Sequence, residues 1–130
     1  LDEIERDAFQ NLTTNNLHGL VFSSNKIRNL NAFSFKNKTI IKLLLDYNRI
    51  EILKNFTFSA MSQLSTLELS NNRISAIEIF AFYSLDKLSY LSLHHNHLKY
   101  IFNNVFDDLL ELDFLDLSYN LIESIDRDAF

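Results

Sequence analysis

Short stretches in which apolar and polar residues alternate recur along this chain at a fixed interval. Three copies of one pattern, L-x-x-L-x-L-x-x-N-x-(I/L)-x-x-I-x-x-x-x-F, begin at Leu64, Leu88 and Leu112. Alternation with a period of two residues is typical of a β-strand. The L-x-L core of each copy therefore predicts a short strand, at residues 67–69, 91–93 and 115–117.

The same pattern continues toward the start of the chain. Copies that begin near residues 40 and 17 fit it with slight changes, and residues 4–9 form the tail of one more. Asparagine falls at positions 25, 48, 72, 96 and 120, and phenylalanine follows each by ten residues. Such self-similarity indicates a repeat protein. We expect one array over residues 1–130, with a partial repeat at 1–16 and repeats starting near 17, 40, 64, 88 and 112.

The paired leucines of each repeat predict how the repeats assemble. One repeat cannot bury its leucines alone, but stacked repeats can. Stacking in register aligns the strands as a parallel sheet with about 4.8 Å between neighbours. The leucines that then face the core are Leu67, Leu69, Leu91, Leu93, Leu115 and Leu117. The residues between them point outward onto one face.

This spacing of leucine, asparagine and phenylalanine resembles the leucine-rich repeat family in its 24-residue form, over essentially the whole chain. The resemblance implies an α/β-type solenoid that is mostly β. Its shape would be a right-handed horseshoe with a parallel sheet on the concave side and an irregular or short-helical convex side. The resemblance also assigns the asparagines to a ladder of amide-to-backbone hydrogen bonds. The phenylalanines would stack as a spine inside the outer wall.

Composition adds two constraints. The chain has no cysteine, no proline and one glycine. Disulfides and thiolate zinc sites are therefore excluded within it, and its turns need another repeated device, such as the asparagine ladder. Neither end shows the cysteine-rich cap that secreted members of the family often have. Since solenoids need polar caps for solubility, we expect a fragment of a longer array, or a chain capped from outside this span.

The outward-facing side chains of the sheet are where a partner is expected to bind. The repeat places Tyr90 beside Phe114 and His95 beside Tyr119. Exposed aromatic residues on a rigid sheet are typical binding anchors. The alternative is that Tyr90 and Phe114 pack on each other and bind nothing. The predicted partner-binding residues are Lys42, Tyr47, Glu68, Tyr90, Ser92, His94, Phe114, Asp116 and Tyr119.

Three histidines, His94, His95 and His97, flank the asparagine at position 96. Histidine is a common metal ligand and a pH sensor. Glu68 and Asp116 on the neighbouring strands leave a weak metal site or pH-tuned binding as alternatives. The family geometry puts the histidines on the solvent side without a tight preformed set. We therefore expect solvated or partner-contacting histidines, no metal site and no cofactor.

Charge is uneven along the chain. Residues after Ile101 include eight acids and one base, whereas the first 101 residues include nine acids and eleven bases. An acidic end could steer a basic partner, but a solvated outer wall is the favoured interpretation. The net charge of -5 predicts that the chain binds no nucleic acid. Because it has no run of about eighteen apolar residues, no direct membrane insertion is expected.

Three N-glycosylation sequons begin at Asn11, Asn37 and Asn55. A chain this rich in asparagine, serine and threonine would contain roughly two by chance. Their placement says more, since none lies on the predicted sheet and glycans there would leave the binding face clear. This placement favours an extracellular chain, either secreted or in a cell-surface ectodomain.

These observations predict a protein–protein interaction module and no enzyme, because the chain has no catalytic motif and an open sheet offers no closed cleft. It would be the ligand-binding part of an extracellular leucine-rich repeat receptor, adhesion or innate-immune recognition protein. The residue composition of the repeats resembles that of invertebrate Toll-like, chaoptin-like and leucine-rich immune proteins. Its partner would be a protein ligand or co-receptor, with homo- or heterodimerisation left open. The alternative is an intracellular leucine-rich repeat scaffold that binds a regulatory protein.

Overall fold

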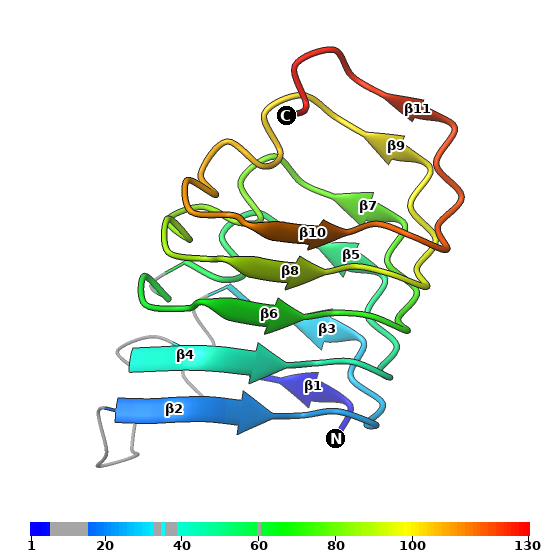
Figure 1. Ribbon diagram of the computed structural model, residues 1–130. Helices are drawn as coiled ribbons and strands as arrows, with labels where there is room; N and C mark the ends of the chain where they lie inside the picture. The colour runs from blue at the N-terminus through cyan, green and yellow to red at the C-terminus, as the bar shows by residue number, and fades with distance from the viewer. Residues whose placement is uncertain (6–15, 33–34, 36–38, 60) are drawn as a thin grey trace.

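The computed structural model of the chain describes residues 1–5, 16–32, 35, 39–59 and 61–130. The chain winds into a solenoid whose turns each place one strand in a common sheet and a two-residue strand on the other side (Figure 1). The strands are β1 (Glu3–Ile4), β2 (Asn16–Val21), β3 (Asn29–Leu30), β4 (Thr39–Leu44), β5 (Ile52–Leu53), β6 (Thr66–Glu68), β7 (Ala76–Ile77), β8 (Tyr90–Ser92), β9 (Tyr100–Ile101), β10 (Phe114–Asp116) and β11 (Ser124–Ile125).

The common sheet is parallel and has the order β10-β8-β6-β4-β2, while the short strands pair as β1-β3, β5-β7 and β9-β11. The register aligns Leu43, Leu67, Leu91 and Leu115 in one row. The predicted parallel solenoid is therefore confirmed. None of the described residues is helical, so the described convex side is built from short strands and turns and the fold is mostly β. The described residues also contain no helix long and apolar enough to cross a membrane.

The core lies between the sheet and the outer turns, by which we mean residues 54–64, 78–88 and 102–112. The inward leucines of the central strands are fully buried, namely Leu67, Leu69, Leu91 and Leu93. Rings in the outer turns stack in a row that Phe130 continues at the end of the chain, with centroids 5.4 to 6.1 Å apart. The rings are those of Phe58, Phe82, Phe106 and Phe130. The predicted phenylalanine spine is confirmed over these turns. Each fully buried leucine or phenylalanine stabilises the fold by about 1.5–3 kcal/mol.

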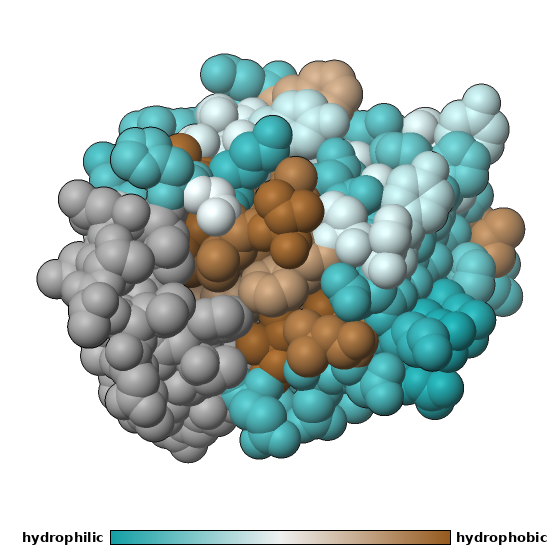
Figure 2. All heavy atoms as spheres, turned by 90° about the horizontal axis from the view of Figure 1, so that it is seen from below, coloured by the Kyte–Doolittle hydropathy of each residue, from teal (hydrophilic) through white to brown (hydrophobic). Residues whose placement is uncertain are grey.

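Burial of the core depends on contact between successive turns. Figure 2 looks onto the end of the coil where β1 and β2 lie and shows a patch of apolar side chains, with mostly hydrophilic ones to its right. At the opposite end, Leu115 and Leu117 are half-buried, whereas Leu91 and Leu93, one turn earlier, are fully buried. The same residue types at the same repeat positions thus differ in burial because a further turn covers only the earlier pair.

The asparagine side chains connect consecutive turns through hydrogen bonds. Asn96 Oδ1 accepts the N–H of Ile74 at 2.9 Å, and Asn96 Nδ2 donates to the carbonyl of Leu69 at 3.0 Å, both in the preceding turn. Nδ2 also donates to Leu93 of its own turn at 2.9 Å. The same arrangement recurs at Asn48, Asn72 and Asn120. The predicted ladder is confirmed.

The ladder is only half of the device that turns the chain. The residue before each ladder asparagine has a left-handed backbone with φ between 51° and 58°, and these residues are Ser24, Tyr47, Asn71, His95 and Tyr119. A positive φ is uncommon outside glycine and is a clear outlier for bulky residues. The one glycine, Gly19, lies in β2 and does not have a positive φ. The chain therefore makes these turns with strained ordinary residues.

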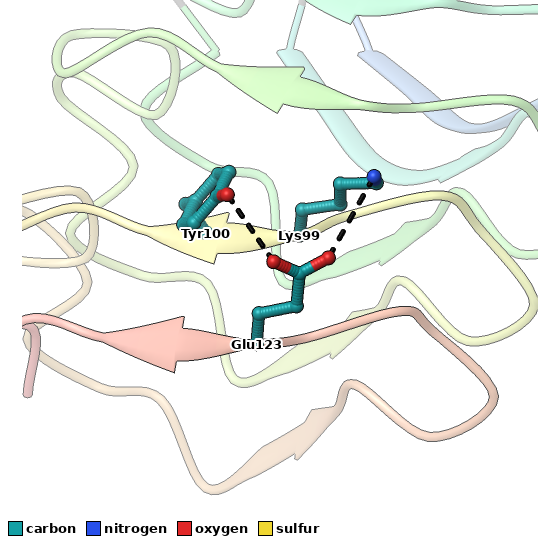
Figure 3. A network of polar contacts seen from close by, with 3 residues as sticks. All are labelled: Lys99, Tyr100 and Glu123. Carbon is teal, nitrogen blue, oxygen red and sulfur yellow. Dashed lines mark hydrogen bonds and ion pairs between the residues drawn. The ribbon is translucent and has the colours of Figure 1, made fainter.

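A side-chain contact on the short-strand side also spans two turns (Figure 3). Lys99 Nζ lies 3.6 Å from Glu123 Oε1, and the Tyr100 hydroxyl donates to Glu123 Oε2 at 3.2 Å. These groups are exposed, and exposed ion pairs contribute only about 0–1 kcal/mol. The asparagine ladder and the core, rather than this network, hold the turns together.

We predict that Asn96→Ala lowers the free energy of unfolding by about 1–3 kcal/mol, because buried backbone groups of two turns lose their partners. Urea unfolding followed by circular dichroism measures the loss. Asn103→Ala is the matched control, since Asn103 is exposed and an exposed change of this kind costs less than about 0.5 kcal/mol. Equal stabilities of the two variants would contradict the ladder's role.

We predict that Tyr47→Gly raises the free energy of unfolding by about 0.5–1 kcal/mol, because glycine adopts a positive φ without strain. The Tyr47 side chain is 59% exposed, so its removal uncovers little of the core. The control is Glu51→Gly, at an exposed position that lacks a positive φ, where glycine should be destabilising. Both changes are measured by urea unfolding, and a loss of stability at Tyr47 would refute the strain argument.

Candidate ligand-binding face

The outward side of the five-stranded sheet, here called the sheet face, presents a pair of stacked aromatic rings. The register pairs Tyr90 of β8 with Phe114 of β10, and their ring centroids lie 4.8 Å apart with planes inclined by 6°. The predicted contact is confirmed. Phe114 remains 47% exposed, so the pair packs internally and still offers apolar area to a partner.

A shallow hollow lies beside this pair. It has a volume of about 300 Å³ and is lined by Lys42, Leu44, Thr66, Glu68 and Tyr90. Leu44 and Thr66 were not among the predicted binding residues, which were chosen mainly for aromatic or charged side chains. Both occupy outward positions of the repeat, and that periodic position is the signal that could have found them.

The two charged side chains that line the hollow, Glu68 and Lys42, differ in their hydrogen bonding. Glu68 Oε1 accepts the N–H of Ser70 at 3.0 Å, and the Tyr90 hydroxyl donates to Glu68 Oε2 at 3.5 Å. Burial raises the pKa of Tyr90, and the Glu68 carboxylate raises that pKa further. Lys42, by contrast, has no side-chain hydrogen bond or ion pair within the described part of the chain. Its ammonium group is therefore available to a ligand.

A second cluster occupies the end of the sheet face. His94 Nδ1 lies 2.7 Å from His95 Nδ1, a contact in which one nitrogen donates and the other accepts. The His95 ring stacks on Tyr119 with centroids 4.2 Å apart, as the repeat predicted. Hydrogen bonds from Ser118 lower the pKa of Asp116, and the charges of the two histidines add smaller effects. The cluster presents aromatic and hydrogen-bonding groups side by side.

The structure does not support a preformed metal site here. In the described ranges, no three histidine or carboxylate side chains converge closely enough to hold a metal ion. His97 is exposed, and its backbone N–H donates to Ile74 in the preceding turn. His94 and His95 lie at the end of the sheet face, whereas His97 lies in the segment that follows the turn out of β8.

One predicted binding residue needs correction. Ser92 lies on β8 as expected, but its exposed fraction is 0%, and its hydroxyl has no hydrogen-bond partner among the described residues. Position in the repeat fixes which way a side chain points, whereas its accessibility depends on the size of the neighbouring side chains. Ser92 is small, so we leave it out of the surface that a ligand meets.

The predicted glycosylation sites are only partly visible. Asn11 and Asn37 lie outside the described residues. Asn55 lies in an outer turn just after β5, is half-buried, and donates its backbone N–H to Glu78 Oε2 at 2.7 Å. Asn55 therefore lies in a part of the repeat that does not contribute to the sheet face.

The stacked turns, the asparagine ladder and the open sheet face define a repeat solenoid. The leucine rich repeat pattern matches residues 38–98 and 62–122, well over half of the chain. The chain belongs to the leucine-rich repeat family. No curated protein matches the sequence at a significant level.

Among solved structures, the chain is similar to the crystal structure of a TLR13-ssRNA13 complex, with a TM-score of 0.57 and 21% sequence identity. The match covers 88% of this chain and 23% of that chain. At this level of identity the similarity shows the fold alone. This chain spans less than a quarter of the longer solenoid.

The prediction that the chain binds no nucleic acid is wrong as an exclusion, because a solenoid of this fold occurs in a complex with single-stranded RNA. The prediction rested on the net charge of the whole chain. All of the acidic excess lies after Ile101, since the residues before it include more bases than acids. Lys42 on the sheet face is unpaired among the described residues. A net charge does not determine the potential over one face.

We predict that Glu68→Gln lowers the pKa of Tyr90 toward, but not to, its ordinary value of 10.0, because burial persists when the carboxylate is removed. An NMR titration of the Tyr90 ring measures the change. Glu51→Gln, on an exposed residue beside β5, is the control and should leave the Tyr90 titration unaltered. An identical titration in the Glu68→Gln protein would show that the carboxylate does not act on this hydroxyl.

Proposed function

We propose that the chain is the ligand-binding part of an extracellular leucine-rich repeat receptor, adhesion or innate-immune recognition protein, and that it binds a protein ligand or co-receptor through the sheet face. The observation that carries this proposal is the stacked Tyr90–Phe114 pair beside the hollow that contains Lys42 and Glu68. Aromatic side chains on a rigid support are the residues that most often dominate binding energy.

Rigidity supports a binding role. The outward residues sit on the strands of one parallel sheet, of which β4, β6 and β8 are paired on both sides and β10 is paired with β8. The sheet is backed by a buried core, so a partner orders few side chains on docking. Less conformational entropy is then lost on association. Leucine-rich repeat proteins are typically binding modules rather than enzymes, and an open sheet face with a shallow hollow suits contact with a large ligand better than enclosure of a small substrate.

The extracellular context is supported by the sequons and by the 24-residue form of the repeat. Asn55 lies in an outer turn, so a glycan there would leave the sheet face free. The alternative is an intracellular scaffold that binds a regulatory protein through the same face. Glycosylation in the native source separates the two, since only a chain that passes through the secretory pathway carries N-linked sugars.

Single-stranded RNA is a second candidate ligand, favoured by one feature of the sheet face. Tyr90, Phe114 and Tyr119 offer flat rings on which bases stack, and Lys42 offers a free positive charge for a phosphate. Proteins that bind single strands combine these two elements. The TLR13-ssRNA13 complex shows that a solenoid of this fold is compatible with such a ligand.

The proposal is tested by presenting the chain to a panel of secreted and cell-surface proteins and to a panel of single-stranded RNA oligonucleotides. For a partner found in either panel, Tyr90→Ala combined with Phe114→Ala should weaken binding by more than about 2 kcal/mol, roughly thirty-fold. The same double variant should unfold within about 1 kcal/mol of the wild type.

Leu110→Ala is the matched control, because Leu110 is 78% exposed on an outer turn. It should leave affinity unchanged. If the double variant binds as tightly as the wild type, the proposed face is wrong. A partner from the RNA panel alone, with binding that falls steeply with salt, would replace the protein ligand by RNA and leave the face in place.

A further inference from the structure

Two consecutive outer turns present a cluster of exposed aromatic rings away from the sheet face. Phe56 and Phe80 stack with centroids 5.6 Å apart and planes inclined by 6°. Tyr83 meets both edge-on, at 5.6 Å and 6.4 Å. The three side chains are 39%, 44% and 45% exposed. They form a rigid apolar surface, here called the aromatic seat, that the proposed binding face does not use.

The side chain of Asn55 is hydrogen-bonded to the backbone of the aromatic seat. Phe80 donates its N–H to Asn55 Oδ1 at 3.0 Å. Only the amide oxygen can accept this bond, so the orientation of the side-chain amide is fixed by chemistry. Its nitrogen Nδ2 makes no hydrogen bond to any described residue. An N-linked sugar is attached through this nitrogen, which is therefore the free end of an amide held beside Phe80.

The backbone at Phe56 is strained, whereas the same conformation at the equivalent residue Asn104 is tolerated. Phe56 has a φ of 61°, and the equivalent residue two turns later, Asn104, has a φ of 62°. Asparagine tolerates this conformation, whereas for a bulky aromatic residue it is a genuine outlier. Strain of about 1–3 kcal/mol persists only when the surroundings hold the residue in place. Here the Phe56 N–H donates to the Phe80 carbonyl at 2.9 Å, and the rings stack.

We propose that Asn55 carries an N-linked glycan whose first N-acetylglucosamine packs on the aromatic seat formed by Phe56, Phe80 and Tyr83. The apolar face of a pyranose ring has about the size of a phenyl ring, so it covers aromatic area that water otherwise contacts. The fixed amide limits the positions that the first sugar can take. This inference rests on the extracellular function proposed above.

The modification is a group transfer from a lipid-pyrophosphate-linked oligosaccharide. A bond forms between Asn55 Nδ2 and C1 of the first sugar, and the bond from C1 to the pyrophosphate oxygen breaks. The leaving pyrophosphate takes the electron pair, and the amide gives one proton to a base of the transferase. The sequon hydroxyl of Thr57 is 1% exposed and donates to the Lys54 carbonyl at 2.7 Å. Because the folded turn hides this hydroxyl, Asn55 must be modified before the turn folds.

The test compares two preparations of the protein. One is made in bacteria and has no glycan. The other is secreted from animal cells with the help of an added signal peptide, and its glycan is trimmed enzymatically to the first sugar. Asn11→Gln and Asn37→Gln are present in both proteins, so that only Asn55 is modified. We expect the glycosylated protein to melt about 3–6 °C higher. We also expect NMR signals of the sugar ring to show the upfield ring-current shifts of a group held over an aromatic face.

Two variants remove the seat and keep the sequon. Phe56→Asn introduces the residue type found at position 104, and Phe80→Asp introduces the type found at position 128. In the combined variant, the glycosylated and bacterial proteins should melt within about 1 °C of each other. If the combined variant fails to fold, Tyr83→Ser replaces it. In that variant the ring-current shifts of the sugar signals should be smaller than in the protein with Tyr83. Failure of Asn55 to be modified, or an equal thermal shift with and without the seat, would overturn the inference.

Val105→Thr gives a matched control within the chain. It creates a sequon at Asn103, whose backbone N–H bonds to Asp126 Oδ2 at 3.1 Å much as that of Asn55 bonds to Glu78. Asn104 and Asp128 occupy the places that Phe56 and Phe80 hold at the seat. Glycan at Asn103 should raise the melting temperature by less than about 1 °C, and an equal rise at both sites would contradict the seat.

Protein from the native source separates this inference from the proposed function. Glycan at Asn55 supports both. Glycan at Asn11 or Asn37 with a bare Asn55 overturns the inference and leaves the extracellular function in place. Bare asparagines at all three sequons overturn both, and the intracellular scaffold then becomes the working description.

Discussion

Each turn of this solenoid depends on one buried amide. The side chain of a ladder asparagine accepts an N–H from the turn before it, donates to a carbonyl of that turn, and donates again to carbonyls of its own turn. An amide supplies two N–H donors and a separate carbonyl acceptor at the same end, whereas a hydroxyl supplies one donor and a carboxylate supplies none. Since the turn out of each strand leaves backbone groups unpaired in a buried place, loss of the amide exposes several of them at once.

The ladder operates together with a strained residue that precedes it. In each of five turns this residue has a left-handed backbone, although none is glycine. These residues also connect the turns. In the left-handed conformation, the N–H groups of Tyr47, Asn71 and His95 donate to carbonyls of the next turn. Two of these residues, His95 and Tyr119, are also in contact on the sheet face. The constraint that turns the chain thus positions part of the candidate binding surface.

The two faces of the molecule hold aromatic residues in different ways. On the sheet face, Tyr90 and Phe114 come together because successive strands pair in register. In the outer turns, Phe56 and Phe80 come together through backbone hydrogen bonds between turns of irregular shape. The members of both pairs are 24 residues apart. The first pair is open to a large ligand, while the second lies beside a sequon. The same periodicity therefore separates a surface for recognition from one suited to a covalently attached sugar.

Periodicity predicted the parallel sheet and the inward leucines, because both are fixed by spacing along the chain. The resemblance to the leucine-rich repeat family predicted the asparagine ladder and the phenylalanine spine. Periodicity also placed Tyr90 against Phe114 and His95 against Tyr119, since neighbours across a parallel sheet are one repeat apart. Only the tertiary structure decided that Ser92 is covered, that Leu44 and Thr66 line a hollow, and that the residue before each asparagine is left-handed. Accessibility and backbone strain depend on the sizes of neighbours from several turns, and a repeat pattern contains no such information.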